Sequence, residues 1–293
     1  MVLSVRPRRS VLYMPGSNER ALEKAKTLAA DTLILDLEDA VAPDAKATAR
    51  AHVVSAVHAG GYGKRELIIR VNGLGTAWGK DDIMAAAGSG ADGILLPKVE
   101  AAADIHSALG HMDGAGAPSA MALWCMMETP QAVLRADEIA AASDRIACFV
   151  MGTNDLVKDM RAQHTPMRLP MITALGLCML AARAHDIAIL DGVYNEFKDI
   201  DGFTAACRQG LEMGFDGKTL IHPGQVSPCN AVFSPSEEQV AFARKIADAF
   251  AEAEAAGKAV VVVDGRMIEN LHVEQGRRLL AMAEAIADQA EAS

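Results

Sequence analysis

Short apolar segments alternate with segments of helical periodicity along most of the chain. Eight of them have the length and composition of buried strands: Ser10–Met14, Thr32–Asp36, Leu67–Val71, Gly93–Leu96, Leu123–Met127, Cys148–Met151, Ala188–Leu190 and Lys218–Ile221. The segments between them repeat apolar residues at helical spacing, as in 46–59 and 170–184. Eight strand–helix units are the number found in a (β/α)8 barrel, so the alternation predicts an α/β fold of the TIM-barrel type.

The pattern changes after the eighth predicted strand. Three elements are expected there: a long Ala-rich helix over 236–256, a β-hairpin over 259–269 with an Asp-Gly turn, and a final helix over 271–287. The barrel is already complete at this point. We therefore predict a barrel domain over residues 1–230 and a C-terminal helix–hairpin–helix extension over 231–293, acting as a lid, an oligomer contact or both.

Charged and polar residues stand where several predicted strands end. The groups concerned are Asp36 and Glu38 at the end of the second strand, Arg70 at the end of the third, Glu128 after the fifth, and Gly152-Thr153-Asn154-Asp155 after the sixth. An apolar strand that ends in a charge directs that charge out of the core. Because neighbouring parallel strands end on one rim, and that rim carries the active site of TIM barrels, we expect these side chains to meet there.

Glu128 and Asp155 follow two consecutive strands. Two adjacent carboxylates repel each other unless a cation or a proton lies between them. A hard divalent ion with few protein ligands and several waters would satisfy both, which indicates Mg²⁺. The alternative is that one or both acids cap the helix that follows.

Arg70 is a candidate for binding a substrate carboxylate or an oxyanion through paired hydrogen bonds. An internal salt bridge to Asp36 or Glu38 is the alternative, and the two can coexist if the acids orient the guanidinium. His222, after the eighth predicted strand, also faces the rim. We favour a hydrogen-bonded structural role over a catalytic one for His222.

The net charge of −10 disfavours nucleic acid as a partner, because phosphate binding needs a positive field. The first thirty residues are nevertheless basic, with Arg6, Arg8, Arg9, Arg20, Lys24 and Lys26. Near the first predicted strand–helix loop these residues form either a phosphate-binding patch or a solvated face. Arg20 and Lys24 are the candidate cofactor-binding residues.

Nothing in the sequence indicates secretion or membrane insertion. The five cysteines are odd in number, far apart and mostly within apolar segments, so we expect reduced core thiols. No apolar run approaches the ~18 residues of a membrane span, and no signal peptide is recognisable. A cytoplasmic location with no membrane partner is expected.

The motifs resemble those of the citrate lyase β-subunit-like branch of the HpcH/HpaI aldolase superfamily, which includes malyl-CoA and citramalyl-CoA lyases and malyl-CoA thioesterases. The resemblance runs from about Arg8 to the final helix. It rests on Arg9-Ser10-Val11-Leu12 with Pro15-Gly16-Ser17, Asp36-Leu37-Glu38-Asp39-Ala40-Val41, Arg70-Val71-Asn72-Gly73, Pro97-Lys98-Val99-Glu100, Met127-Glu128-Thr129, Gly152-Thr153-Asn154-Asp155-Leu156, and Gly214-Phe215-Asp216-Gly217-Lys218 with Ile221-His222-Pro223.

The resemblance implies a TIM barrel with a C-terminal extension, assembled as a homotrimer or homohexamer. It makes Glu128 and Asp155 the Mg²⁺ ligands and Arg70 the substrate-binding, oxyanion-stabilising cation, supported by Asp36 and Glu38. The motif at Gly152, Thr153 and Asn154 supplies further candidate substrate-binding residues.

In many relatives the extension closes over a neighbouring subunit's site and contributes an acid from a Met-Ile-Asp segment. Here the segment is Met267-Ile268-Glu269, so the acid is one methylene longer. Catalysis is sensitive to shifts of ~1 Å, so this difference bears on what Glu269 does as a catalytic acid or base.

The reaction implied by the resemblance is Mg²⁺-dependent cleavage of a 3-hydroxyacyl-CoA, such as citramalyl-CoA or malyl-CoA, to acetyl-CoA and a 2-oxo acid. Two alternatives remain open. One is a thioesterase that uses the same site and releases CoA without a 2-oxo acid. The other is a carrier-dependent citrate lyase β-like subunit without activity on free CoA esters.

Overall fold

The computed structural model describes residues 5–255 and 260–291. The chain divides into two compact units. The larger comprises Arg8–Phe233, and the smaller consists of the segment from Ser234 onward together with the N-terminal residues up to Pro7. The division falls after the helix α10 (Val226–Phe233), whereas the boundary predicted at residue 230 would cut this helix.

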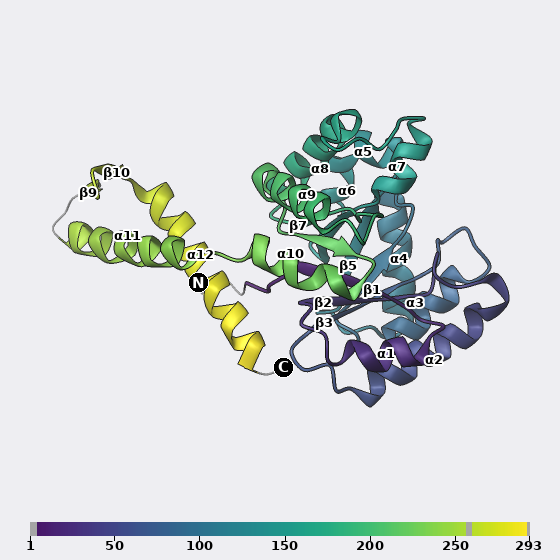
Figure 1. Ribbon diagram of the computed structural model, residues 1–293. Coiled ribbons are helices and arrows are strands. Elements are labelled where there is room, and N and C mark those ends of the chain that lie inside the picture. Colours follow the sequence, from purple (N-terminus) through teal and green to yellow (C-terminus); the bar gives the residue numbers. More distant parts are fainter. Residues whose placement is uncertain (1–4, 256–259, 292–293) are drawn as a thin grey trace. The chain divides into compact units, whose positions relative to one another are not determined.

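The larger unit is a closed barrel of parallel strands in the order β1 to β8. The strands are β1 (Ser10–Pro15), β2 (Thr32–Asp36), β3 (Glu66–Arg70), β4 (Gly93–Leu96), β5 (Ala122–Met127), β6 (Ile146–Met151), β7 (Ala188–Asp191) and β8 (Gly217–Leu220). Each coincides with a predicted strand to within two residues at either end. The predicted TIM barrel is confirmed, and Figure 1 shows its helices lying outside the strands.

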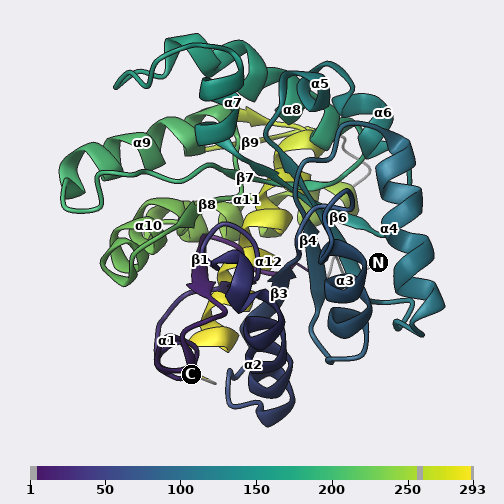
Figure 2. The same cartoon turned by 90° about the vertical axis from the view of Figure 1, so that its right-hand side faces the viewer.

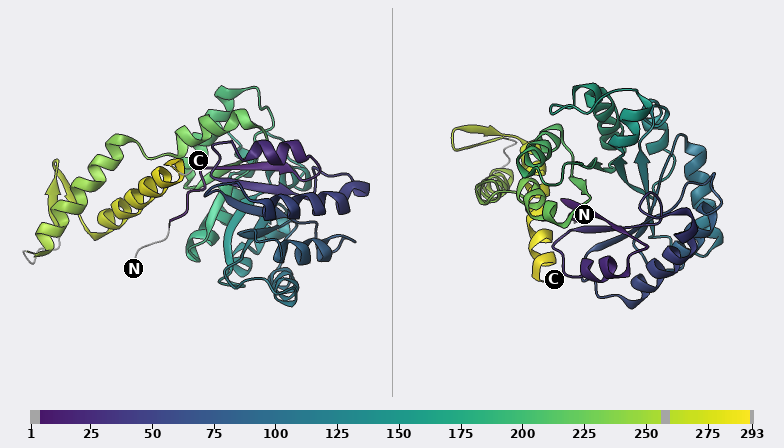
Figure 3. Two further views of the ribbon diagram at one scale, coloured as in Figure 1. Left: turned by 90° about the horizontal axis from the view of Figure 1, so that it is seen from below. Right: turned by 45° about the vertical axis from the view of Figure 1, so that its right-hand side comes forward.

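Helices lie between the barrel strands, and one more follows β8 within the larger unit. They are α1 (Glu19–Ala25), α2 (Lys46–Ala59), α3 (Gly79–Ala87), α4 (Ala102–Gly114), α5 (Pro130–Leu134), α6 (Ala136–Ala140), α7 (Thr153–Asp159), α8 (Ile172–Ala184), α9 (Ile200–Met213) and α10. Between β5 and β6 the chain forms two short helices, α5 and α6, which meet at Arg135. Figures 2 and 3 show this outer layer from other sides.

Two apolar layers hold the barrel together. Strand residues of one parity face outward and pack against the helices, as Leu33 and Leu35 do. Residues of the other parity fill the barrel interior: Val11, Ile34, Ile68, Leu95, Trp124, Met126, Cys148, Val150 and Leu190. Because side chains alternate along a strand, continuing the interior parity leads directly to Asp36, Arg70 and Glu128 at the rim. The packing of the core therefore fixes which residues reach the candidate site.

The smaller unit consists of α11 (Glu237–Ala255), a hairpin of β9 (Val261–Val263) and β10 (Arg266–Ile268), and α12 (Asn270–Glu291). The hairpin prediction is confirmed, and both turn residues have positive φ, as a type I′ turn requires. The predicted ends at residues 256 and 259 lie outside the described residues. An apolar core of this unit joins Ile246, Phe250, Val263, Ile268 and Val273.

All five cysteines are buried and unpaired, as predicted. Among residues 5–255 and 260–291, no helix combines the length and apolar character needed to span a membrane.

Candidate active site

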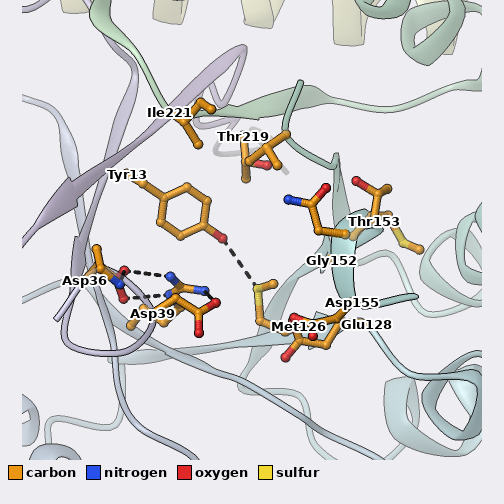
Figure 4. Close-up of a pocket in the computed structure, with 15 residues that line it drawn as sticks. Tyr13, Asp36, Asp39, Met126, Glu128, Gly152, Thr153, Asp155, Thr219 and Ile221 are labelled. Carbon is orange, nitrogen blue, oxygen red and sulfur yellow. Dashed lines mark hydrogen bonds and ion pairs between the residues drawn. The ribbon is translucent and has the colours of Figure 1, made fainter. Parts of the chain in front are cut away.

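A pocket of about 320 Å³ opens at the carboxyl ends of the barrel strands. Its lining comes from seven of the strands or the segments after them: Tyr13, Asp36, Asp39, Ala40, Arg70, Met126, Glu128, Met151, Gly152, Thr153, Asn154, Asp155, Val193, Thr219 and Ile221. Figure 4 shows Asp36 and Asp39 on one side of the pocket and Glu128 and Asp155 on the other. The structure thus brings together the rim residues that the sequence predicted to meet.

Arg70 is fixed by Asp36, its neighbour in the β2–β3 register. Nε and Nη2 of Arg70 donate to the two carboxylate oxygens of Asp36 at 2.7 and 2.6 Å. The guanidinium also stacks on the Tyr13 ring, with 4.7 Å from Cζ to the ring centroid. Burial works to lower the pKa of Arg70, but Tyr13, Asp36 and Glu38 outweigh it and raise that pKa well above its ordinary value. Arg70 is a permanently charged, oriented donor in the pocket wall.

Glu38 also lies beside the guanidinium of Arg70, but unlike Arg70 it has a pKa close to neutral. Its Oε2 is 2.8 Å from Nη1 of Arg70 but lacks the alignment of a hydrogen bond, and within the described residues this buried oxygen has no other partner. Burial raises the pKa of Glu38 to about 7, and Arg70 offsets this only in part. The charge of Arg70 is already largely neutralised by Asp36, so little attraction remains for a second carboxylate.

The raised pKa of Glu38 gives a testable pH dependence. A folded-state pKa of about 7 against an ordinary 4.5 means that the folded protein holds a proton the unfolded chain releases. The contribution of Glu38 to the free energy of unfolding is fully present below pH 4.5, and ~2–3 kcal/mol of it is lost as the pH rises to 7. Urea unfolding of EDTA-treated protein between these pH values should show this slope, and Glu38→Gln should remove it.

The matched control for that experiment is Glu100→Gln, which changes an exposed acid on the β4–α4 loop. Its unfolding free energy should keep the pH slope of the unmodified protein. An unchanged slope in Glu38→Gln would contradict a raised pKa of Glu38 in the folded protein.

The two predicted metal ligands are bridged by a lysine that the metal prediction did not use. The backbone N–H of Lys98 donates to Oε1 of Glu128 at 2.8 Å, and its ammonium lies 2.8 Å from Asp155 and 3.5 Å from Glu128. Lys98 has a left-handed φ of 52°, uncommon for a residue with a side chain. Burial is the main cause that raises the pKa of Glu128. A cation between these carboxylates is therefore part of the folded site.

The donor set of the pocket fits a hard divalent cation. Four carboxylates and one guanidinium line it, a net charge of −3 that Lys98 reduces only partly. Within the described residues no cluster of three or more His, Cys, Asp or Glu side chains could hold a metal. An ion bound by Glu128 and Asp155 would need water or substrate oxygens to complete its coordination, which is how Mg²⁺ commonly binds.

Gly152 allows β6 to approach Glu128. A Cβ at this position would lie 2.3 Å from Cβ and 2.7 Å from Oε2 of Glu128. We expect Gly152→Ala to destabilise the protein by ~3 kcal/mol and to displace the Glu128 carboxylate, measured as unfolding free energy and activity. Gly176→Ala is the control, because nothing lies within 4 Å of the added Cβ inside α8. It should stabilise the helix slightly, by ~0.5–1 kcal/mol.

The remaining residues of the motif at the end of β6 have different surroundings. Asp155 lies in the first turn of α7, and its partner is Lys98 rather than the helix N-terminus. Thr153 is buried in the pocket wall. Asn154 is exposed and exchanges two side-chain hydrogen bonds with Asn195, at 3.1 and 2.9 Å. All three line the pocket, so their substrate-binding and metal-binding roles remain predictions.

The predicted basic patch does not form as one surface. Arg8 pairs with Glu66, and Arg9 pairs with Asp31, at the amino-terminal ends of the strands and so away from the pocket. The prediction of a phosphate-binding patch is therefore wrong for these two arginines. Their buried carboxylate partners precede or begin neighbouring strands, which the charge count alone could not reveal.

The other predicted residues lie outside the pocket. Arg20 and Lys24 are exposed on α1, after the carboxyl end of β1, and their cofactor-binding role remains a prediction. Glu269 is exposed between β10 and α12 in the smaller unit, so its catalytic role also remains a prediction. His222 stacks on Phe197, and its Nδ1 accepts a hydrogen bond from the backbone N–H of Gly224. These contacts agree with the hydrogen-bonded structural role that the sequence favoured for His222.

Tyr13 was not singled out from the sequence. It stacks on Arg70, and its hydroxyl lies 3.5 Å from the sulfur of Met126. Burial raises the pKa of Tyr13, so the phenol remains neutral and polar in the wall. The alternation of side chains along β1 could have identified Tyr13, because it follows Val11 on the interior face of the strand.

Sequence comparison identifies the family. Residues 9–223 match the model of the HpcH/HpaI aldolase/citrate lyase family, so the chain belongs to this family. A (3S)-malyl-CoA thioesterase of Cereibacter sphaeroides is 53% identical over 287 residues, covering 98% of each chain. The citrate lyase subunit beta of Leuconostoc mesenteroides is 34% identical over 96% of this chain and 94% of its own.

Solved structures share the architecture. CitE from Mycobacterium tuberculosis, determined in complex with magnesium, acetoacetate and coenzyme A, superposes with a TM-score of 0.76 at 26% identity, over 96% of this chain and 100% of its own. The fold of this chain is thus the fold of a protein whose crystals hold a metal ion, a small oxo acid and CoA.

Proposed function

We propose that this protein is a magnesium-dependent enzyme acting on a malyl-CoA-type thioester, and that hydrolysis to the free hydroxy acid and CoA is its net reaction. The observation that carries the proposal is the polarised pocket, with Arg70 held by Asp36 on one side and Glu128 and Asp155 on the other. The full-length 53% identity to a (3S)-malyl-CoA thioesterase supports hydrolysis over carbon–carbon cleavage.

Glu128 and Asp155 would hold the metal ion, and the magnesium in the complex of CitE from Mycobacterium tuberculosis supports Mg²⁺ as that ion. When bound, the ion supplies Lewis-acid polarisation of the substrate oxygens. With its net charge of −3, the pocket lining repels an anionic substrate until a divalent ion is present. Substrate binding is therefore expected to require the metal.

Arg70 would stabilise the negative charge that develops on the substrate. In hydrolysis, water forms a bond to the thioester carbon, the C–S bond breaks, and the thiolate takes up a proton. The carbonyl oxygen carries the charge in between, and an N–H of Arg70 aimed at it stabilises that state without reorganising. Asp36 occupies only Nε and Nη2, so the donor proposed for the substrate is Nη1, which lies 2.8 Å from Oε2 of Glu38 without a hydrogen bond to it.

Carbon–carbon cleavage is the second candidate. A lyase for L-malyl-CoA and beta-methylmalyl-CoA from Cereibacter sphaeroides is 34% identical over 96% of each chain. In this reaction the substrate hydroxyl loses its proton, the adjacent C–C bond breaks, and the electron pair forms an acetyl-CoA enolate that is protonated on carbon. Arg70 would serve the same electrostatic role for the enolate oxygen.

Two assays run in parallel separate these reactions. Malyl-CoA and citramalyl-CoA are incubated with the enzyme and Mg²⁺, and free thiol and 2-oxo acid are measured independently. Thiol without 2-oxo acid supports hydrolysis, and 2-oxo acid with acetyl-CoA supports the lyase. If neither product forms, the result supports a carrier-dependent subunit. Full turnover after EDTA treatment would contradict the role of the metal.

Glu269 is proposed to contribute the acid that completes the reaction, from the extension of a neighbouring copy in a homotrimer or homohexamer. The same assays with Glu269→Ala and Glu269→Asp test this role. Glu269→Ala should reduce turnover, and Glu269→Asp should change the ratio of thiol to 2-oxo acid. Full activity of Glu269→Ala would remove this residue from the mechanism.

A further inference from the structure

Tyr13 places a phenol inside the candidate active site. It stands near the carboxyl end of β1, and its side chain is partly exposed and lines the pocket. Figure 4 shows its ring between Asp36 on one side of the pocket and Glu128 on the other. The phenol is therefore a polar group of the pocket to which the proposed function assigns no task.

The present hydrogen-bond partner of the Tyr13 hydroxyl is a poor one. Within the described part of the chain this partner is the sulfur of Met126, at 3.5 Å. A thioether sulfur is a weak acceptor, so a negatively charged substrate oxygen would take the hydrogen in its place. Burial raises the pKa of Tyr13, so the phenol keeps its proton at neutral pH and is a donor.

Two other neutral side chains of the lining are engaged with better acceptors. The Thr219 hydroxyl has a single hydrogen, which it donates to the backbone carbonyl of Asp191 at 3.1 Å. The side-chain amide of Asn154 is paired in both directions with that of Asn195. Of these three neutral donors, Tyr13 has the weakest acceptor and gives up the least on binding a substrate.

Tyr13 and Arg70 border the same part of the pocket. The guanidinium lies over the Tyr13 ring, with 4.7 Å from Cζ to the ring centroid. Asp36 holds Nε and Nη2 of Arg70, and Nη1 is the donor proposed for the carbonyl oxygen of the substrate. Because the two side chains are stacked, an oxygen that approaches Nη1 from the pocket also lies beside the tyrosine.

We propose that the Tyr13 hydroxyl is a second hydrogen-bond donor to the thioester carbonyl oxygen of the substrate, beside Nη1 of Arg70. This inference rests on the proposed function, which supplies the substrate. In hydrolysis the oxygen becomes negative when water adds to the carbon, and in carbon–carbon cleavage it carries the charge of the enolate. In either case Tyr13 donates a hydrogen bond and transfers no proton, so it stabilises the charge as an oxyanion-hole donor does.

Tyr13→Phe tests this role, because it keeps the ring on Arg70 and removes only the hydroxyl. With malyl-CoA and Mg²⁺, the kcat for thiol or 2-oxo acid release should fall by about 10²-fold, while KM changes less than about threefold. The effect falls on kcat because the oxygen is a stronger acceptor once it is charged.

Tyr62→Phe is the matched control. Tyr62 is buried outside the pocket lining, and its hydroxyl donates to the backbone carbonyl of Leu22 at 3.2 Å. This variant should lose thermal stability and keep its kcat.

Tyr13→Leu separates the hydroxyl from the ring. It removes both, so it should lower kcat at least as much as Tyr13→Phe does. If Tyr13→Leu loses activity while Tyr13→Phe keeps the kcat of the unmodified protein, the ring supports Arg70 and the hydroxyl has no catalytic role. That result would overturn the proposal.

Binding of malate tests the same contact without turnover. In malate a free carboxylate replaces the thioester carbonyl, so a charged oxygen stands where the reaction would create one. Calorimetric titration of the protein with malate in Mg²⁺ should give an affinity about tenfold weaker for Tyr13→Phe than for the unmodified protein or Tyr62→Phe.

This titration keeps the two proposals apart. An unmodified protein that releases neither thiol nor 2-oxo acid contradicts the proposed function, and malate binding then decides the role of Tyr13. In that case a tenfold loss in Tyr13→Phe supports the contact. Equal affinity of Tyr13→Phe and the unmodified protein, or no malate binding by either, overturns it.

Discussion

Replacing Arg70 by lysine is expected to lower kcat/KM by about 10²–10³-fold. Lysine keeps the positive charge but presents a single ammonium in place of the planar fork that Asp36 holds through Nε and Nη2. The donor would no longer be fixed where negative charge develops in the reaction. Steady-state kinetics with the thiol and 2-oxo acid readouts measures the effect.

Arg65→Lys is the control for this variant. Arg65 stands at the opposite end of β3, is equally buried, and donates to the backbone carbonyls of Leu28 and Tyr62. It should lose thermal stability as Arg70→Lys does, yet keep its kcat/KM. If both variants lose activity in proportion to their melting temperatures, Arg70 has a structural role only.

Glu128→Gln is expected to abolish the response to Mg²⁺ and to reduce turnover by about 10³-fold. The amide keeps the shape of the side chain and can still accept from the backbone N–H of Lys98, so the fold should survive. Calorimetric titration with Mg²⁺ alone measures the loss of metal binding independently of activity.

The control is again the exposed acid Glu100, changed to glutamine. It should bind Mg²⁺ and turn over substrate as the unmodified protein does. Unchanged Mg²⁺ affinity in Glu128→Gln would show that the ion binds elsewhere, and the proposed site would fall with it.

The sequence predicted the barrel well, because the signal is local and repeated. Each strand is an apolar run bounded by polar loops, and each must bury both faces in a parallel barrel. Because side chains alternate along a strand, the sequence alone then predicts that Asp36, Arg70 and Glu128 lie on one rim. The ends of the helices are harder to predict. The break at Arg135 is not marked by a glycine or proline, and Thr153–Asp159 is too short to show helical periodicity.

Other parts of the site depend on distances that a sequence does not contain. Lys98 reaches Glu128 and Asp155 because its backbone is left-handed, a conformation that the residue type does not suggest. The pairing of Arg8 with Glu66 joins residues 58 positions apart. The residue types themselves indicated a metal site at Glu128 and Asp155 and an anion-binding role for Arg70, and the resemblance to a family made these roles specific to a reaction.

The position of Lys98 has a consequence for how the protein acquires its metal. Its ammonium lies 2.8 Å from Asp155 and supplies a counter-ion that belongs to the chain itself. Lys98 also holds Glu128 through its backbone N–H, so one residue contacts both proposed metal ligands. An incoming ion must compete with a tethered charge that never diffuses away. A monovalent ion gains less than a divalent ion from the same two carboxylates, so we expect this competition to weaken the binding of monovalent ions most.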